Sequence, residues 1–308
     1  MQRDIVTNLV IAGGSLTGLF ECLLSLEEIA YCASHTMVLD NSHCGVAARV
    51  KMGFPGVEVV RPPEPLTFAG AANAGLRRAF AGGSRLVLLL NDDVTVHHET
   101  AGLLAAAQRA FGPGLYQCEI WPYEPGLPRE RWRLDWHKRL VVREAAEPAG
   151  DARPIPLDYA EASAVMVSSE VFEATGGFDE DLGFYFEDAD LSVRAQEAGY
   201  PVMEVPDARV WHKMSLSAGR GLSPFKAYYR ARNTLRFACK HPRRASRARN
   251  AIHHFGEFVL PATFEALAGT PLEGRRSQVI AAIMRGTADS LTGWQRPPRA
   301  PVEGPRRA

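Results

Sequence analysis

The chain has 308 residues, of which 46% are hydrophobic and 23% charged, and its 35 basic residues balance 35 acidic ones. This composition is typical of a globular protein with a sizeable core, and the balanced charge excludes a global field that recruits nucleic acid or anionic lipid. Five cysteines in no C-x-x-C pair argue against a zinc knuckle or a disulfide framework. No apolar run approaches the roughly 20 residues that span a bilayer, and the N-terminal apolar stretch is short for a signal peptide. We therefore expect a cytoplasmic protein.

The first third of the chain alternates between strand-like and helix-like patterns. Strand-like segments cover 5–13, 36–42, 57–62 and 85–94, and helix-like segments cover 18–30 and 69–83. This alternation predicts an α/β architecture with a mainly parallel sheet covered by helices on both faces. In such sheets ligands bind beyond the carboxyl ends of the strands, which is where the polar residues 40–42 and 91–93 fall.

The rest of the chain is less regular. Residues 112–157 are rich in proline and tryptophan without a steady period, which is typical of a functional loop or of a surface hairpin with a local aromatic core. Residues 163–178 predict a strand, a short helix and a glycine turn, and residues 200–212 predict two short strands. From residue 224 the pattern becomes helical and basic, 277–294 predicts an amphipathic helix, and we expect the tail from about 295 to be mobile.

Three carboxylates crowd together in the segment GFYFEDADLSVRAQEAGY, at positions 187, 188 and 190. Locally they suit a helix start, because acidic residues in a first turn complement the helix dipole and cap free N–H groups. Asp190 and Arg194 also have the spacing of an ion pair on one helix face. Judged by itself, the segment therefore favours a structural role, and a catalytic role for Glu187 and Asp188 needs support from elsewhere in the chain.

The run Asn91–Asp93 stands where an apolar strand stops, a place where Asn and Asp also form ordinary turns. Its carboxylates suit Mg²⁺ or Mn²⁺, because these ions prefer oxygen ligands and take further ligands from substrate phosphates. We predict Asp93 as the direct ligand. His212, at the end of a predicted strand, could add one nitrogen, with His97 and His98 as rival candidates. Each histidine could equally be an ordinary packed or surface residue.

Five motifs in this order carry a family resemblance: VLDNS (38–42), FAGAANAGL (68–76), LLLNDDV (88–94), GGFDEDLGFYFEDADLSVRAQEAGY (176–200) and VWHKMSLSAG (210–219). Over residues 5–240 they resemble the inverting glycosyltransferases of family 2, above all the rhamnosyltransferase-like branch. The resemblance implies a GT-A fold, a Rossmann-like mixed and mainly parallel sheet flanked by helices. It also implies a domain at 1–223, with a nucleotide-sugar half (1–111) and an acceptor and catalytic half (112–223), before a helical extension at 224–308.

The resemblance further implies roles for single residues. Asp188 matches the catalytic base and Glu187 its partner. Asp93 matches the last aspartate of the family's D-x-D metal motif, and His212 matches a histidine that completes the metal or diphosphate site in some members. The residues implied in donor binding are Asp40, Asn41, Asn73, Asn91 and Asp92. The chain departs from the family at Asn91, which replaces the first aspartate of the motif, and at VIAGGSLTG, where a tyrosine-asparagine segment usually ends the first strand.

Inverting sugar transfer fits these residues chemically. An acceptor hydroxyl attacks the anomeric carbon through an oxocarbenium-like transition state and needs a carboxylate to take its proton. Charge gathers on the departing nucleoside diphosphate, where Mg²⁺ or Mn²⁺ would neutralise it. We expect Glu187 to raise the pKa of Asp188 by like-charge proximity, which would make the aspartate a better base near neutral pH.

Two other functions compete with this hypothesis. The run AGGSLTGL faintly echoes sugar-1-phosphate nucleotidylyltransferases, and a catalytically silent nucleotide- or carbohydrate-binding relative would keep the fold without the reaction. The expected partners are a nucleotide-diphosphate sugar and a saccharide, lipid-linked or small-molecule acceptor, without nucleic acid. The arginine-rich stretch 220–250 could grip a diphosphate or a lipid headgroup, but we favour an ordinary solvated helix face. A peripheral membrane contact and a homodimer are left open.

Overall fold

The structure is a computed structural model that describes residues 4–13, 16–31, 34–42, 45–135, 140–146, 153–213, 222–241, 247–261, 263–264 and 276–293. Gly14 and the predicted mobile tail from about 295 lie outside these residues. The chain packs as two compact units. The first comprises Met1–Arg133, Arg143–Glu180 and Glu187–Ser217, and the second comprises Leu134–Val142, Asp181–Phe186 and Ala218–Ala308. The predicted domain boundary at residue 223 stays a prediction.

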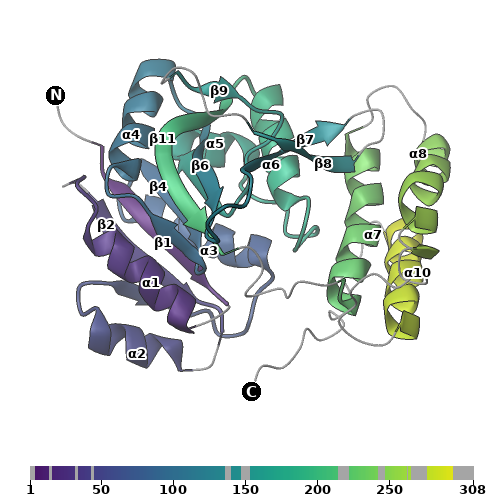
Figure 1. The fold of residues 1–308 in the computed structure, drawn as a ribbon, viewed down its shortest axis with the longest axis horizontal. Coiled ribbons are helices and arrows are strands. Elements are labelled where there is room, and N and C mark those ends of the chain that lie inside the picture. The colour runs from purple at the N-terminus through teal and green to yellow at the C-terminus, as the bar shows by residue number, and fades with distance from the viewer. Residues whose placement is uncertain are drawn as a thin grey trace. The chain divides into compact units, whose positions relative to one another are not determined.

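The first unit contains a mixed nine-stranded sheet in the order β3-β2-β1-β4-β10-β6-β11-β5, with β9 paired to β11 (Figure 1). Its strands are β1 (Val6–Ala12), β2 (Ser34–Asp40), β3 (Glu58–Val60), β4 (Leu86–Asn91), β5 (Val94–Val96), β6 (Leu115–Pro122), β9 (Ile155–Pro156), β10 (Ala164–Ser168) and β11 (Val202–His212). Its helices are α1 (Leu16–Glu27), α2 (Val46–Gly53), α3 (Phe68–Ala81), α4 (Thr100–Phe111), α5 (Ser169–Thr175) and α6 (Glu187–Glu197). Strands β7 (Glu130–Asp135) and β8 (Leu140–Ala145) form a separate two-stranded sheet.

Strands β1 to β4 form the parallel half of the sheet, as the alternating pattern predicts. They are apolar on both faces because helices cover both sides. Side chains of α1, α2 and α4 pack with Val10 and Leu88 on one face, and those of α3, α5 and α6 pack with Leu9 and Leu89 on the other. The registers align Ala12 with Asp40 and Ile11 with Asn91, so the polar ends of β2 and β4 meet at one edge.

The segment 112–157 contains two paired strands, as the hairpin interpretation expects, and also a strand that neither interpretation predicted. It begins with β6, a buried strand inside the main sheet, and continues into the hairpin of β7 and β8. A single strand, β11, replaces the two short strands predicted at 200–212. Its register against β6 shifts between Val205 and Arg209, and Asp207 adopts a positive φ of 64° there. This bulge interrupts the alternation, which is why the sequence resembles two strands.

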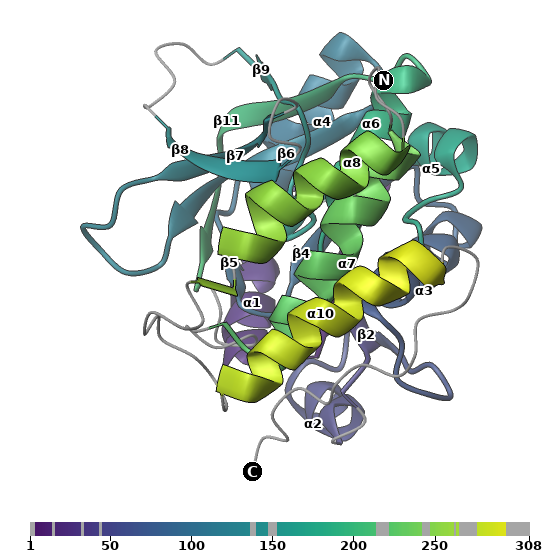
Figure 2. The ribbon, with the colours of Figure 1, turned by 90° about the vertical axis from the view of Figure 1, so that its right-hand side faces the viewer.

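The second unit contains α7 (Pro224–Lys240), α8 (Arg247–His254), the π-helical turn η1 (Phe255–Val259) and α10 (Arg276–Thr292). Figure 2 shows α8 and α10 in front of α7, against which both pack. Tyr228 and Tyr229 of α7 form a core with Val279 and Ile283 of α10. A Cβ on Gly286 would clash with the Tyr228 carbonyl oxygen, so only glycine permits this approach of α10 to α7. No helix among the described residues is long and apolar enough to cross a membrane.

Two arginines of α7 do not lie on the solvated helix face that the charge pattern favours, whereas Arg230 does. Arg232 is fully buried and Arg236 nearly so. Arg232 donates to the carbonyl oxygens of Asp181 and Leu182, and Arg236 donates to those of Asp181 and Gly293. Asn233, between them in sequence, donates to the carbonyl oxygens of residues 182, 184 and 185. These side chains are buried because they satisfy the backbone of a loop that forms no regular structure of its own.

Candidate active site at the carboxyl edge of the sheet

The predicted metal motif forms a tight turn between β4 and β5. Asp92 and Asp93 are both buried, and Asp92 Oδ2 accepts a hydrogen bond from the backbone N–H of Gly13 at 3.0 Å. That contact joins the ends of β4 and β1. A Cβ on Gly18 of α1 would lie 3.0 Å from the Asp92 carbonyl oxygen, so a glycine lets α1 approach the turn closely. A Cβ on Gly13 would meet no atom within 4 Å, which leaves open space beside the turn.

The carboxylate of Asp93 lies beside His212. His212 Nε2 is 3.1 Å from Asp93 Oδ1, and the Asp93 side chain is only 3% exposed. No well-oriented hydrogen bond from the described residues reaches either Asp93 oxygen, and His212 Nδ1 also lacks a partner there. Neighbouring ligands of an octahedral ion with bonds of about 2.1 Å stand about 3 Å apart, so this pair has suitable spacing and chemistry for Mg²⁺ or Mn²⁺.

Of the three candidate histidines, only His212 is found beside Asp93. His212 pairs with Val94 at the start of β5, and the Lys213 N–H donates to the Asp93 carbonyl oxygen at 3.0 Å. His97 follows the other end of β5, where its N–H donates to the Arg209 carbonyl oxygen. His97 lies three residues beyond Val94 along the strand, which corresponds to about 10 Å. His97, His98 and Glu99 form their own exposed cluster, with possible ligand atoms within 4.8 Å of one another.

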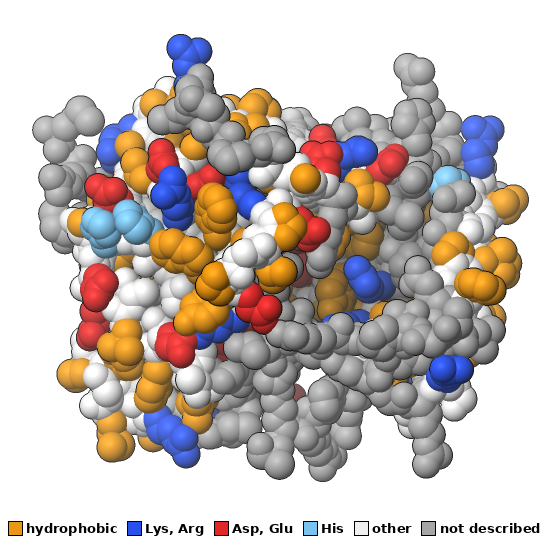
Figure 3. Space-filling model, viewed as in Figure 1, with side chains coloured by type: hydrophobic (Ala, Val, Ile, Leu, Met, Phe, Trp, Pro, Cys, Tyr) orange, Lys and Arg blue, Asp and Glu red, His pale blue; other side chains and the backbone are white. Residues whose placement is uncertain are grey.

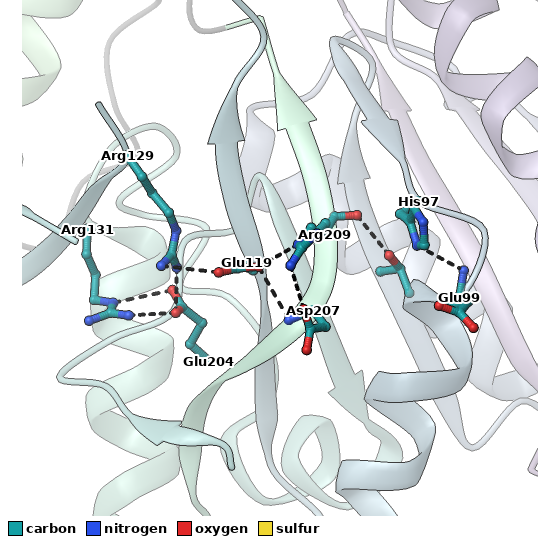
Figure 4. A network of polar contacts seen from close by, with 9 residues as sticks. His97, Glu99, Glu119, Arg129, Arg131, Glu204, Asp207 and Arg209 are labelled. Carbon is teal, nitrogen blue, oxygen red and sulfur yellow. Dashed lines mark hydrogen bonds and ion pairs between the residues drawn. The ribbon is translucent and has the colours of Figure 1, made fainter. Parts of the chain in front are cut away.

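The bulge of β11 sets the position of His212, and a buried ionic network holds the bulge (Figure 4). Glu119 on β6 accepts from the Asp207 N–H and from Arg209 Nε, at 3.3 and 3.1 Å. Its other carboxylate oxygen lies 3.4 Å from Arg129 Nη1. Arg129 also pairs with Glu204, which binds Arg131 as well. Beyond the bulge the strand resumes pairing and brings Trp211 and His212 opposite β5.

The predicted catalytic base Asp188 and its neighbour Glu187 are the first two residues of α6, as the local helix pattern indicates. Glu187 is buried, and its Oε2 has no hydrogen-bond partner among the described residues. Asp188 is half-buried, and it accepts from the N–H groups of Ala189 and Ala162 at 2.8 and 3.5 Å. Asp190 instead binds Arg194 Nε at 2.7 Å, as its spacing predicts. Of the three carboxylates, Asp190 is therefore the one that a charged side chain holds in place.

The pKa values of this pair differ from the sequence-based expectation in their cause. Burial raises the pKa of Asp188 to about 6, against the opposing effect of its hydrogen bonds from backbone N–H groups. The pKa of Glu187 is raised further, first by burial and then by the negative charges of Asp188 and Asp190. The like-charge effect that we expected on Asp188 therefore appears on Glu187, which is the more deeply buried of the two carboxylates.

A short series of hydrogen bonds joins Asp188 to the turn at Asp92 and Asp93. Ala162, whose N–H reaches Asp188, precedes Ser163, and the Ser163 carbonyl oxygen accepts from the Asn91 N–H at 2.9 Å. Glu161 precedes Ala162 in the chain. Burial acts to lower the pKa of His212, but the hydrogen bond and charge of Asp93 and then the charge of Glu161 raise it, and the net shift is upward. No motif in the sequence singles out Glu161, which is a lone acid before a strand. The structure thus brings Asp188, Glu161, Asp93 and His212 to one edge of the sheet.

Three of the implied donor-binding residues, Asp40, Asn41 and Asn73, have side chains that form hydrogen bonds within the protein. Asp40 is fully buried and accepts from the Ser42 N–H, from Ser42 Oγ and from the Ala47 N–H. Three hydrogen bonds from the described residues therefore hold this carboxylate in place. The Asn41 amide exchanges two hydrogen bonds with the backbone of Leu66. Asn73 binds the backbone of Phe178 in both directions and donates to Glu180 Oε1. A nucleotide contact by these side chains remains a prediction.

Solved structures with a similar fold are glycosyltransferases of the GT-A class. GalNAc-T7 with UDP, GalNAc and Mn²⁺ superposes with a TM-score of 0.59 at 14% identity, over 89% of this chain and 59% of that one. The mannosyltransferase PcManGT from Pyrobaculum calidifontis, with GDP-Man and Mn²⁺, gives 0.58 at 17% identity, over 95% and 88% of the two chains. At these identities the likeness establishes the fold, and it confirms the predicted GT-A architecture.

The family follows from the sequence itself. The chain belongs to the glycosyltransferase-like family 2, whose model matches residues 6–236. The N-acetylglucosaminyl-diphospho-decaprenol L-rhamnosyltransferase of Mycobacterium tuberculosis is 33% identical over 96 residues, which are 31% of this chain and 28% of the relative. The dTDP-rhamnosyl transferase RfbF of Shigella flexneri is 25% identical over 177 residues, 54% of this chain and 57% of the relative. The matches therefore span about a quarter to a little over half of these relatives.

Proposed function

We propose that this protein transfers a sugar from a nucleotide-diphosphate sugar to an acceptor hydroxyl with inversion at the anomeric carbon. The supporting observation is that the buried Asp93 carboxylate, which lies beside His212 and accepts no well-oriented hydrogen bond from the described residues, is at the same sheet edge as the half-buried Asp188. One group suits a cation on the diphosphate and the other suits proton removal from the acceptor. A protein that only binds a nucleotide does not need a carboxylate that removes a proton from an acceptor.

In the proposed reaction, the acceptor oxygen forms a bond to the anomeric carbon while the bond from that carbon to the diphosphate oxygen breaks. The electron pair leaves with the nucleoside diphosphate, and the hydroxyl proton passes to Asp188. Glu187 keeps its own proton and limits the negative charge beside the base. Asp93 and His212 would hold Mg²⁺ or Mn²⁺, which when bound neutralises charge on the leaving diphosphate.

Donor binding in the proposal uses the edge formed by β1, β2 and β4. The open space beside Gly13 gives a phosphate or base access to the backbone. Asp40, Asn41, Asn91 and Asp92 lie at or just after the ends of β2 and β4 at this edge, and the proposal assigns donor contacts to them and to Asn73 of α3. The relatives in Mycobacterium and Shigella are named as rhamnosyltransferases, so rhamnose joined to dTDP is the first donor to test. A saccharide on a lipid diphosphate, as in the name of the mycobacterial relative, is the first acceptor.

The Asp188→Asn variant tests the proposed base. The amide keeps the size of the side chain but accepts no proton, so we expect transfer to fall by about a hundredfold to ten-thousandfold while donor affinity stays unchanged. Transfer is measured by release of nucleoside diphosphate, and donor affinity by calorimetry. Glu197→Gln, at an exposed position near the end of the same helix, is the matched control and should retain full transfer. Equal turnover by Asp188→Asn and the parent would remove Asp188 from the reaction, and pyrophosphate release from a nucleoside triphosphate and a sugar-1-phosphate would favour a nucleotidylyltransferase.

A further inference from the structure

The two residues before the Glu187–Asp188 pair have an unusual backbone conformation. Tyr185 and Phe186 adopt positive φ angles of 65° and 70°, and the chain then enters α6 directly. Residues other than glycine rarely adopt such angles, because the Cβ atom comes too close to the following carbonyl oxygen. Strained backbone of this kind persists only where the surrounding structure holds it, and it often lies at functional sites. The turn at 185–186 therefore needs a restraint from elsewhere in the chain.

Helix α7 provides this restraint through the side chain of Asn233. The residue is fully buried, and its Nδ2 donates to the carbonyl oxygens of residues 182, 184 and 185 at 2.8, 2.6 and 2.9 Å. The amide has two N–H groups, so the loop uses its whole donor capacity. Buried carbonyl groups need such partners, because water does not reach them. The side chain of Asn233 therefore binds the loop up to the first of the two strained residues.

Two further residues of α7 support Asn233. Arg232 donates to Asn233 Oδ1 at 3.1 Å, which fixes the direction in which the amide points its N–H groups. The ring of Phe237 packs against that of Phe186, with centroids 5.4 Å apart. Figure 3 shows acidic and basic side chains intermixed with hydrophobic ones at the surface, which is their usual place, whereas Arg232 is fully buried. Both strained residues therefore have a partner on α7.

We propose that Asn233 is a positioning residue for sugar transfer, which holds the turn at 185–186 and so fixes where α6 begins and where the Asp188 carboxylate points. The boundary between the two compact units falls between Phe186 and Glu187, so the restraint from the helical unit reaches the base through the backbone. General-base catalysis requires the carboxylate within hydrogen-bond reach of the acceptor hydroxyl, and a small displacement slows the reaction. The inference rests on the proposed function, because it takes Asp188 as the base.

The first test compares Tyr185→Val with Tyr185→Asn in the full chain. Both variants lose the half-buried ring, but asparagine tolerates a positive φ and the β-branched valine does not. We expect Tyr185→Val to lower kcat by about tenfold to a hundredfold through a misplaced base, and Tyr185→Asn to retain most of the parent kcat. Donor affinity, measured by calorimetry with Mn²⁺, should be equal in the two variants, because the turn precedes the base and not the metal site.

The second test replaces Asn233 by leucine, which has a similar size but no N–H donors. The matched control is Tyr228→Phe, which removes the hydrogen bond of α7 to Asp289 Oδ2 at 2.8 Å and leaves those to the loop in place. We expect Asn233→Leu to lower kcat at least about tenfold with unchanged donor affinity, and the control to retain kcat. Without any sugar present, hydrogen exchange of the backbone N–H groups of residues 181–189 should be faster in Asn233→Leu than in the parent or the control.

The positioning role is overturned if Tyr185→Val and Tyr185→Asn have the same kcat, or if Asn233→Leu lowers donor affinity as much as kcat. Exchange of residues 181–189 at the parent rate in Asn233→Leu would also overturn it. The Tyr185 variants leave α7 intact, so they decide the question even where Asn233→Leu does not fold. A parent that transfers no sugar would instead refute the proposed function, whereas a parent that transfers sugar beside variants that behave alike would refute the positioning role only.

Discussion

At the scale of single residues, two adjacent carboxylates acquire different properties from burial. Glu187 is buried without a hydrogen bond to Oε2, and Asp188 is half-buried with two N–H donors. Burial disfavours the charged form, and hydrogen bonds to the carboxylate favour it. Glu187 therefore holds a proton more tightly than Asp188 does. The assignment of Asp188 as the base gains a physical reason that sequence position alone does not give.

The raised pKa of Asp188 predicts the pH dependence of transfer. A base works only when it has lost its proton, so kcat/KM should be level above about pH 6 and should fall as the pH drops through about 6. The measurement is a pH profile of transfer with saturating Mn²⁺. A level profile down to pH 5, or a fall that persists unchanged in the residual activity of Asp188→Asn, would contradict the assignment.

The same pKa has a consequence for stability. Because the folded-state pKa of Asp188 lies above its usual value, the native state binds the proton more tightly than the unfolded state does. The contribution of this carboxyl is fully favourable below its unfolded pKa near 4 and is lost as the pH rises through about 6. Asp188→Asn should therefore unfold at a higher denaturant concentration than the parent at neutral pH, with a smaller difference in acid.

At the scale of elements, the bulge in β11 connects a buried ionic network to the turn at Asp92 and Asp93. Glu119 holds the bulged backbone, and Arg129 and Arg131 hold Glu204 on the same strand. The strand beyond the bulge ends at His212, beside Asp93. The network therefore determines which side chains of β11 face the site. Sequence reasoning missed the network because its members are separated by up to ninety positions.

Replacing Arg129 by methionine tests the network. The change keeps an apolar stem but leaves Glu119 and Glu204 with one arginine partner each instead of two, so we expect a loss of about 3 kcal/mol in the free energy of unfolding. The matched control is Arg133→Met, because the Arg133–Glu144 pair is exposed and should contribute less than about 1 kcal/mol. Denaturant unfolding measures both variants. Equal stability losses would mean that the buried network contributes no more than a surface pair.

Helix α7 illustrates how charge patterns mislead at this scale. Its arginines read as a solvated face, but Arg232 and Arg236 are buried and satisfy carbonyl oxygens of loop 181–185 and of Gly293. Asn233 adds donors to the same loop, in which Tyr185 and then Phe186 have positive φ angles of 65° and 70°. A helix face is solvated only if no neighbour covers it, and the neighbours of α7 are distant in sequence. The loop continues directly into Glu187.

At the scale of the whole molecule, ligand binding should appear as a change in thermal stability. A ligand that binds only the folded form raises the unfolding temperature by mass action. We expect a nucleotide-diphosphate sugar with Mn²⁺ to raise it more than either alone, with dTDP-rhamnose as the first candidate in a panel. Asp93→Ala should remove the increase that depends on Mn²⁺ and leave the remainder. If the metal-dependent increase persists in Asp93→Ala, Asp93 does not bind the ion.

Much of this protein could be read from its sequence. The alternation of apolar strands and amphipathic helices determined the α/β class, and the order of five motifs determined the family, because local periodicity and spacing are written along the chain. The sequence also placed Asp93 and Asp188 at element ends, where side chains are free to serve a site. It left open which histidine accompanies Asp93, and it missed β6 inside the irregular segment 112–157.

Only the tertiary structure decided the rest, because burial and pairing depend on residues that are remote in sequence. The choice of His212 over His97 follows from antiparallel pairing of β11 with β5. The higher proton affinity of Glu187 follows from its deeper burial. The inward arginines of α7 reverse what their local pattern indicates. Each of these properties depends on which residues pack against the side chain, and tertiary packing determines that.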